Sequence, residues 1–150
     1  MNNLNFISPE IFISLSIMFL LILGIFKKNS SSLIQNLSIV LLLITGILIL
    51  NNPFDSTETL FGGSYVIDNL SSLMKFITVL GGAFVLLIST KYLKISKIFL
   101  IEYPILTLCS ILGMMVMISS NDLIVFYIGL ELQSLALYVL ASFNRDQLKS

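Results

Sequence analysis

Long apolar stretches, separated by short polar segments, dominate the sequence. Each stretch approaches the roughly 20 residues that an α-helix needs to cross a hydrocarbon core about 30 Å thick. The pattern therefore predicts an all-α polytopic membrane bundle of about five transmembrane helices. The expected spans cover residues 9–26, 33–50, 73–90, 98–119 and 123–142.

The polar segments mark where these helices begin and end. Glu10 lies in the first turn of the first span, where a carboxylate complements the helix dipole. An outer polar loop is expected at residues 51–72, with a turn at Gly62 and Gly63. Residues 120–122 read Ser-Asn-Asp, a tight connection that supplies an N-cap for the fifth span.

The composition narrows the class of protein. Hydrophobic residues make up 57% of the chain and charged residues 11%, against about 25% charged in a typical soluble domain. The sequence has no histidine, and its one cysteine, Cys109, cannot form an intrachain disulfide, so a metal cluster has almost no ligands. The net charge is zero, so the chain lacks the excess of basic residues that nucleic-acid-binding proteins use.

The basic residues of the expected loops all fall on one side of a five-crossing topology. The positive-inside rule places that side in the cytoplasm, or in the matrix of a mitochondrion, with the N-terminus outside. Lys75 is the exception, near the outer end of the third span, where its long stem is expected to reach the interface. The loop basic residues are Lys27, Lys28, Lys91, Lys94, Lys97, Arg145 and Lys149.

A carboxylate, Glu131, lies inside the fifth span, about 12 Å along the helix from Leu123 at 1.5 Å per residue. A charged side chain at the centre of a bilayer costs roughly 2.5–3.5 kcal/mol on insertion scales. Helical periodicity groups it with other oxygen-bearing side chains into one polar stripe. That stripe comprises Tyr127, Glu131, Ser134, Tyr138 and Ser142.

The stripe predicts a proton relay with Glu131 as its main group and Tyr127, Ser134 and Tyr138 as possible lining. The competing interpretation is a neutral Glu131 that only hydrogen-bonds a neighbouring helix. Such a bond contributes about 0.6 kcal/mol on average, far less than the insertion cost. Lys75 and Glu102 are weaker candidates, since Glu102 suits the first turn of a helix.

Two motifs resemble a known family. PEIF stands near the start, and EYPILTLCSILGMMVMISSNDLIVFYIGLELQSLALYVLASFNRD covers much of residues 98–146. Together they resemble subunit N of respiratory complex I, the proton-pumping NADH:quinone oxidoreductase, whose mitochondrial equivalent is NADH dehydrogenase subunit 2. The resemblance is close over residues 98–146 and weaker before them.

The resemblance implies a role in redox-coupled proton translocation, with Glu131 paired to a lysine on a later helix. It also implies that residues 1–97 form three N-terminal helices and residues 98–150 the first two helices of an antiporter-like repeat. The chain would then be an N-terminal fragment, with the partner lysines beyond Ser150. The expected location is the bacterial inner membrane, or alternatively the mitochondrial inner membrane, as a multi-pass protein.

The resemblance further implies that other membrane-arm subunits, the lipid bilayer and protons are the partners, with no nucleic acid. NADH, FMN, iron–sulfur clusters and quinone would be used by the complex, with no cofactor or metal bound by this chain. Two alternatives stay open. One is an Mrp-type cation/proton antiporter subunit, and the other is a purely structural membrane subunit.

Overall fold

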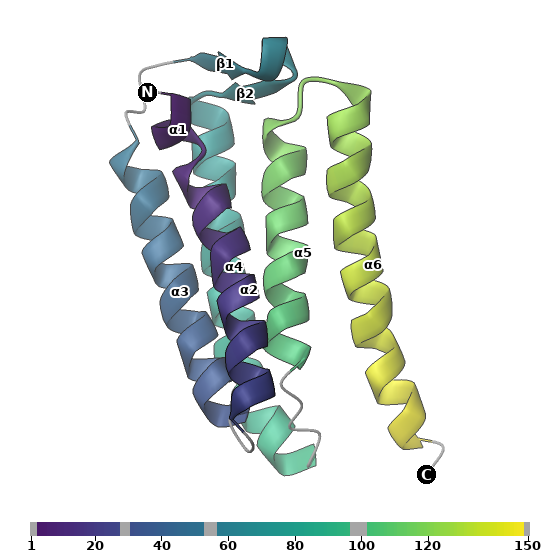
Figure 1. Ribbon diagram of the computed structural model, residues 1–150. Coiled ribbons are helices and arrows are strands. Elements are labelled where there is room, and N and C mark those ends of the chain that lie inside the picture. The colour runs from purple at the N-terminus through teal and green to yellow at the C-terminus, as the bar shows by residue number, and fades with distance from the viewer. Residues whose placement is uncertain (1–2, 28–30, 53–56, 97–101, 149–150) are drawn as a thin grey trace.

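The computed structural model describes residues 3–27, 31–52, 57–96 and 102–148, which form a bundle of long helices beneath a small hairpin (Figure 1). Five of the helices are long and apolar enough to cross a membrane, which confirms the predicted architecture. A single-turn helix, α1, precedes them at Asn3–Phe6. The long helices are α2 (Ser8–Phe26), α3 (Ser31–Asn51), α4 (Asn69–Ser96), α5 (Glu102–Ser119) and α6 (Leu123–Leu148).

The helix ends lie close to those expected, with two extensions. Helix α4 continues to Ser96 and α6 to Leu148, so Lys91, Lys94 and Arg145 lie in helices and not in loops. The apolar parts of these helices still end at Lys91 and Ser142, so the extra turns carry the polar residues past the expected hydrocarbon layer. The predicted start of the fourth span at Ile98 falls outside the described residues.

Side-chain caps set the start of two helices. The backbone N–H of Ser71 donates to Asp68 Oδ1 at 2.7 Å, and the Asp68 N–H donates to Ser71 Oγ at 2.8 Å. This reciprocal pair satisfies N–H groups that have no partner within α4. Before α6, the Ile124 N–H donates to Asp122 Oδ1 at 3.5 Å, in line with the expected N-cap.

The expected outer loop contains an antiparallel hairpin that the sequence did not indicate. Strand β1 (Glu58–Leu60) pairs with β2 (Tyr65–Ile67), with Leu60 opposite Tyr65. Between them the single turn η1 (Phe61–Gly63) places Gly62 at φ +69° and Gly63 at φ +92°. Both values lie in the left-handed region that glycine adopts without a Cβ penalty, which confirms the turn at this pair.

The hairpin lies across one end of the bundle, here called the hairpin end (Figure 1). The Asn121 backbone N–H donates to the Ser64 carbonyl, and Asn121 Nδ2 donates to the Gly63 carbonyl, both at 2.8 Å. These two hydrogen bonds attach the hairpin to the α5–α6 connection, in addition to its contacts with the helices below it.

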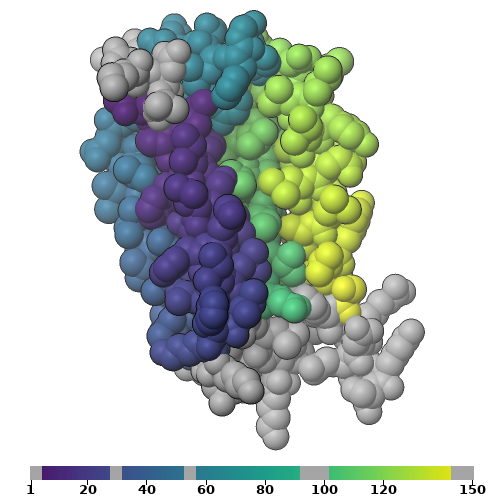
Figure 2. All heavy atoms as spheres, viewed as in Figure 1, coloured from purple at the N-terminus to yellow at the C-terminus, as the bar shows by residue number. Residues whose placement is uncertain are grey.

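The core lies between α2, α3, α4 and α5, whereas α6 lies at one edge and packs chiefly on α5 (Figures 1 and 2). Because apolar side chains gain little from burial against each other in lipid, close packing has to hold such helices together. The largest fully buried apolar side chains of this core include Ile13, Leu20, Ile34, Leu42, Leu86, Leu108 and Met115.

Two glycines bring α5 and α6 together. A Cβ placed on Gly113 would lie 2.8 Å from both the Gln133 backbone nitrogen and the Gly129 carbonyl oxygen. A Cβ on Gly129 would lie 2.9 Å from the Gly113 carbonyl oxygen. The helix backbones therefore approach more closely here than any side chain permits, the arrangement typical of small residues at membrane helix interfaces.

Candidate functional site

The polar stripe of α6 points away from α5. Gly129 and Ala136 are buried on the side that packs against α5. At 100° per residue, Glu131 lies two residues past Gly129 and therefore about 160° around the helix from it. Tyr127 and Tyr138, on the same side as Glu131, are 60% and 70% exposed. The stripe thus forms an open face of the described bundle.

Glu131 is the ionisable group of this face. It is half-buried, and among the residues that the structure describes it has no hydrogen bond or ion-pair partner. It lies within the membrane-crossing part of α6, Leu123–Ser142, close to the middle of that 20-residue length. The carboxylate therefore lies near the middle of a candidate membrane span, on the side of α6 that faces away from α5.

The other predicted members of the stripe differ in their surroundings. Ser134 is half-buried beside Glu131. The Ser142 hydroxyl donates to the Val139 carbonyl of its own helix at 2.7 Å. The lining roles of Tyr127, Ser134 and Tyr138 stay predictions.

Glu102 is the exposed first residue of α5. This position matches the interpretation as a first-turn carboxylate that complements the helix dipole. The structure does not bring it into the stripe on α6.

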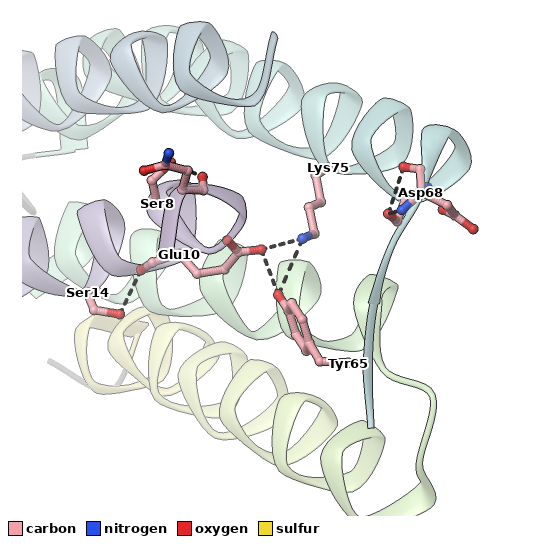
Figure 3. Close-up of polar contacts among 8 residues, drawn as sticks. Ser8, Glu10, Ser14, Tyr65, Asp68 and Lys75 are labelled. Carbon is pink, nitrogen blue, oxygen red and sulfur yellow. Dashed lines mark hydrogen bonds and ion pairs between the residues drawn. The ribbon is translucent and has the colours of Figure 1, made fainter. Parts of the chain in front are cut away.

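Lys75 was expected to extend to the membrane interface, and this expectation is wrong. The side chain turns into the bundle, where Lys75 is 3% exposed and forms an ion pair with Glu10 (Figure 3). Its ammonium group also donates to the Tyr65 hydroxyl at 3.3 Å. Lys75 can be buried because the Glu10 carboxylate of α2 neutralises its charge. The side chain therefore does not need to reach the polar membrane interface.

Glu10, Tyr65 and Lys75 form a buried cluster at the hairpin end (Figure 3). The Tyr65 hydroxyl donates to Glu10 Oε1 at 2.6 Å, so this oxygen accepts bonds from both Tyr65 and Lys75. The Lys75 nitrogen lies 5.1 Å from the centre of the Tyr65 ring, within reach of a cation–π attraction. Burial and the neighbouring Glu10 carboxylate raise the pKa of the Tyr65 phenol well above its usual value.

Sequence reasoning missed Glu10 as part of this cluster, although the sequence held a usable signal. Glu10 and Lys75 lie in the first two turns of α2 and α4, the first and third membrane spans. Successive spans alternate in direction, so both residues must lie at the same end of the bundle. Two opposite charges inside apolar helices at one depth are expected to pair.

The described residues provide no metal centre, since they contain no group of three or more His, Cys, Asp and Glu that could hold an ion. What the arrangement offers is protonatable groups inside a membrane: a buried ion pair at the hairpin end and a carboxylate at mid-depth in α6. Ionisable residues inside transmembrane helices mark ion pathways and proton relays. Fold and site together define a polytopic membrane protein that carries ionisable groups within its membrane-spanning helices.

Comparison with known proteins gives a more specific assignment than the fold and the site alone. No family model matches the chain. NADH-quinone oxidoreductase subunit N of Pelagibacter ubique (strain HTCC1062) is 77% identical over 150 residues, which cover all of this chain and 32% of that protein. The subunits N of Bartonella bacilliformis and Paramagnetospirillum magneticum are 45% and 40% identical over 145 and 142 residues, covering 96% and 95% of this chain and 29% of each relative.

The chain is therefore a homologue of part of NADH-quinone oxidoreductase subunit N, as its motifs indicated, and it is a multi-pass membrane protein with bacterial homologues. It spans about a third of the length of the curated relatives it matches.

Proposed function

We propose that this chain is part of a membrane-arm subunit of a proton-pumping NADH:quinone oxidoreductase, in which Glu131 takes up and releases protons during redox-coupled translocation. The observation that carries the proposal is a carboxylate at mid-depth in a membrane-crossing helix, in a chain 77% identical to a subunit N. NADH, FMN, iron–sulfur clusters and quinone would be bound by other subunits, which are the expected protein partners.

The energetics support a proton-carrying Glu131 over one that only holds helices together. Placing a charge at the centre of a bilayer costs roughly 2.5–3.5 kcal/mol, whereas an interhelical hydrogen bond stabilises the helix pair by only about 0.6 kcal/mol. A serine or asparagine would supply that bond at a lower cost.

The open face of α6 supports a partner outside the described helices. Tyr127 and Tyr138 are exposed and Glu131 is half-buried, on the side of α6 that faces away from α5, yet a carboxylate facing lipid chains would meet the full insertion cost. The relatives are about three times as long as this chain. We infer that further helices of the protein cover this face and place a basic side chain near Glu131, which would stabilise its charged form.

We propose a bacterial inner-membrane location with the hairpin end outside. Helices α2 and α4 end away from the hairpin (Figure 1), where Lys27 caps α2 and Lys91 lies in the later turns of α4. The other basic residue with a described side chain, Lys75, lies at the hairpin end but is buried in an ion pair with Glu10. Basic residues favour the cytoplasmic side. By contrast Glu58 and Asp68 lie at the hairpin end.

The test is proton pumping by the complete complex reconstituted in liposomes, with NADH oxidation measured in the same vesicles. Glu131→Gln and Glu131→Ala are expected to lose most of the proton uptake while the complex still assembles. Glu102→Gln is the matched control, because it removes a carboxylate that lies exposed at a helix end, and it is expected to pump normally. If both Glu131 variants pump at the wild-type rate, Glu131 has a structural role only.

A further inference from the structure

Two buried polar atoms at the hairpin end lack a hydrogen-bond partner among the described residues. They are Glu10 Oε2 and Ser119 Oγ. Ser119, the last residue of α5, is 1% exposed, and Glu10 is 7% exposed. Leaving such an atom unpaired in a dry interior is unfavourable, and more so where the group is charged. Native proteins usually remove this cost with an ordered internal water.

Both atoms belong to the surroundings of the Tyr65 phenol. Tyr65 donates to the other oxygen of the Glu10 carboxylate. The Ser119 hydroxyl lies on the Tyr65 phenol as a hydrogen-bonding neighbour, although no bond of good geometry joins the two groups. The next residue, Ser120, forms a backbone bridge with Tyr65. Both unpaired atoms therefore belong to groups that neighbour the same phenol.

Donors and acceptors balance if that molecule is water. Glu10 Oε2 can only accept, so it takes one water hydrogen, and the Ser119 O–H can donate to the water oxygen. The second water hydrogen remains for the Tyr65 oxygen, which already donates to Glu10 Oε1 and accepts from Lys75. The water then makes three bonds, the usual number for a buried water.

We propose that Glu10, Tyr65 and Ser119 bind an internal water molecule at the hairpin end, which bridges Glu10 Oε2 to Ser119 Oγ. This site is distinct from Glu131 and does not rest on its proposed role. The bound water hydrates the Glu10–Lys75 ion pair inside the bundle.

Two arrangements compete with a bound water. In one, the Ser119 hydroxyl donates directly to the Tyr65 oxygen, and in the other the Ser119 side chain is rotated towards its own helix. Several serines of this protein donate to the carbonyl four residues earlier, as Ser16 does to Phe12 at 2.7 Å and Ser38 does to Ile34 at 2.7 Å. If Ser119 did the same, it would bond to the Met115 carbonyl and Glu10 Oε2 would be left without a bridge. That outcome would overturn the proposal.

The first test is an electron cryomicroscopy structure of the full-length protein in lipid, at a resolution that shows ordered water. The proposal expects density within about 2.7–3.2 Å of both Glu10 Oε2 and Ser119 Oγ. Absence of that density, or a Ser119 hydroxyl turned to its own helix, would overturn it.

The second test is hydroxyl-radical labelling of the same protein by X-ray radiolysis, which generates radicals from bound water. Tyr65, although only 6% exposed, is expected to be labelled readily. Ser119→Val, whose methyl groups occupy the water position, should slow this labelling severalfold. Ser110→Val is the matched control on the same helix, since Ser110 borders a cleft of about 450 Å³ with room for methyl groups. Equal Tyr65 labelling in wild type and Ser119→Val would contradict the proposal.

Discussion

The buried ion pair at the hairpin end makes a quantitative prediction for Lys75→Met. Methionine keeps most of the length of the lysine stem but removes its charge and its donors. Lys75 is 3% exposed, and it contacts both Glu10 Oε1 and the Tyr65 hydroxyl. The substitution leaves the buried Glu10 carboxylate with Tyr65 as its remaining described donor.

The expected loss follows from the uncompensated charge. Breaking a buried pair by removing one partner costs about 3–5 kcal/mol in free energy of unfolding. At about 1.4 kcal/mol per tenfold change, the ratio of folded to unfolded protein falls by roughly two to three and a half orders of magnitude. Replacing both partners is often neutral, because the desolvation of both charges disappears together. Glu10→Gln/Lys75→Met is therefore expected to recover most of the loss.

The assay is reversible unfolding in detergent micelles, monitored by circular dichroism, on wild type, both single variants and the double variant. Lys91→Met serves as the control, since Lys91 is exposed on the same helix, and its effect should stay within about 0.5 kcal/mol. The reasoning is refuted if Lys75→Met unfolds like wild type, or if the double variant is no more stable than Lys75→Met.

Two further predictions concern helix packing and the Tyr65 phenol. Gly113→Ala should lower the free energy of unfolding by about 1–3 kcal/mol, because the new Cβ would lie 2.8 Å from backbone atoms of α6. Gly81→Ala is the control. A Cβ at Gly81 has nothing within 4 Å, so this variant should be neutral or slightly stabilising in the same unfolding assay. Comparable losses for both variants would contradict the close approach. The raised pKa of Tyr65 predicts that its phenol stays protonated in the folded protein above about pH 10, so that stability falls as pH rises and the unfolded phenol ionises. Ultraviolet titration of wild type against Tyr65→Phe checks this, and an added tyrosinate signal near pH 10 in the folded wild type would refute it.

The membrane architecture could be predicted because each span has to satisfy a simple length and polarity requirement. Hydrocarbon thickness sets the length, and the polar residues at 51–52 and 120–122 mark the ends. The extension of α6 to Leu148 had no such signal, since the helix continues through polar residues after the apolar segment ends.

The hairpin and the buried ion pair could not be predicted from local pattern. Each strand has only three residues, which is too short for an alternation of apolar and polar residues to be recognised. The hairpin is stabilised by Leu60, Tyr65 and Ile67, which pack on the end of the bundle. Lys75 was placed at the interface because its partner lies 65 residues earlier in the chain. Tertiary proximity decides the direction of such a side chain, and its own helix does not.

Glu131 lies within the fifth span, as expected, and helical periodicity groups it with the other members of its stripe on one side of α6. The role of that stripe stays a prediction. The sequence did not show which side α5 covers. That side is set by the glycine contact between Gly113 and Gly129, which turns the polar stripe outward.

The central claim is that Glu131 changes its protonation state as the complex turns over. Redox-triggered infrared difference spectroscopy of the whole complex measures this directly, through the carbonyl stretch of a protonated carboxyl group. The account predicts a band that appears or shifts on reduction, moves on deuteration, and is missing from Glu131→Gln but kept in Glu102→Gln. An identical carboxyl difference spectrum in wild type and Glu131→Gln would contradict it.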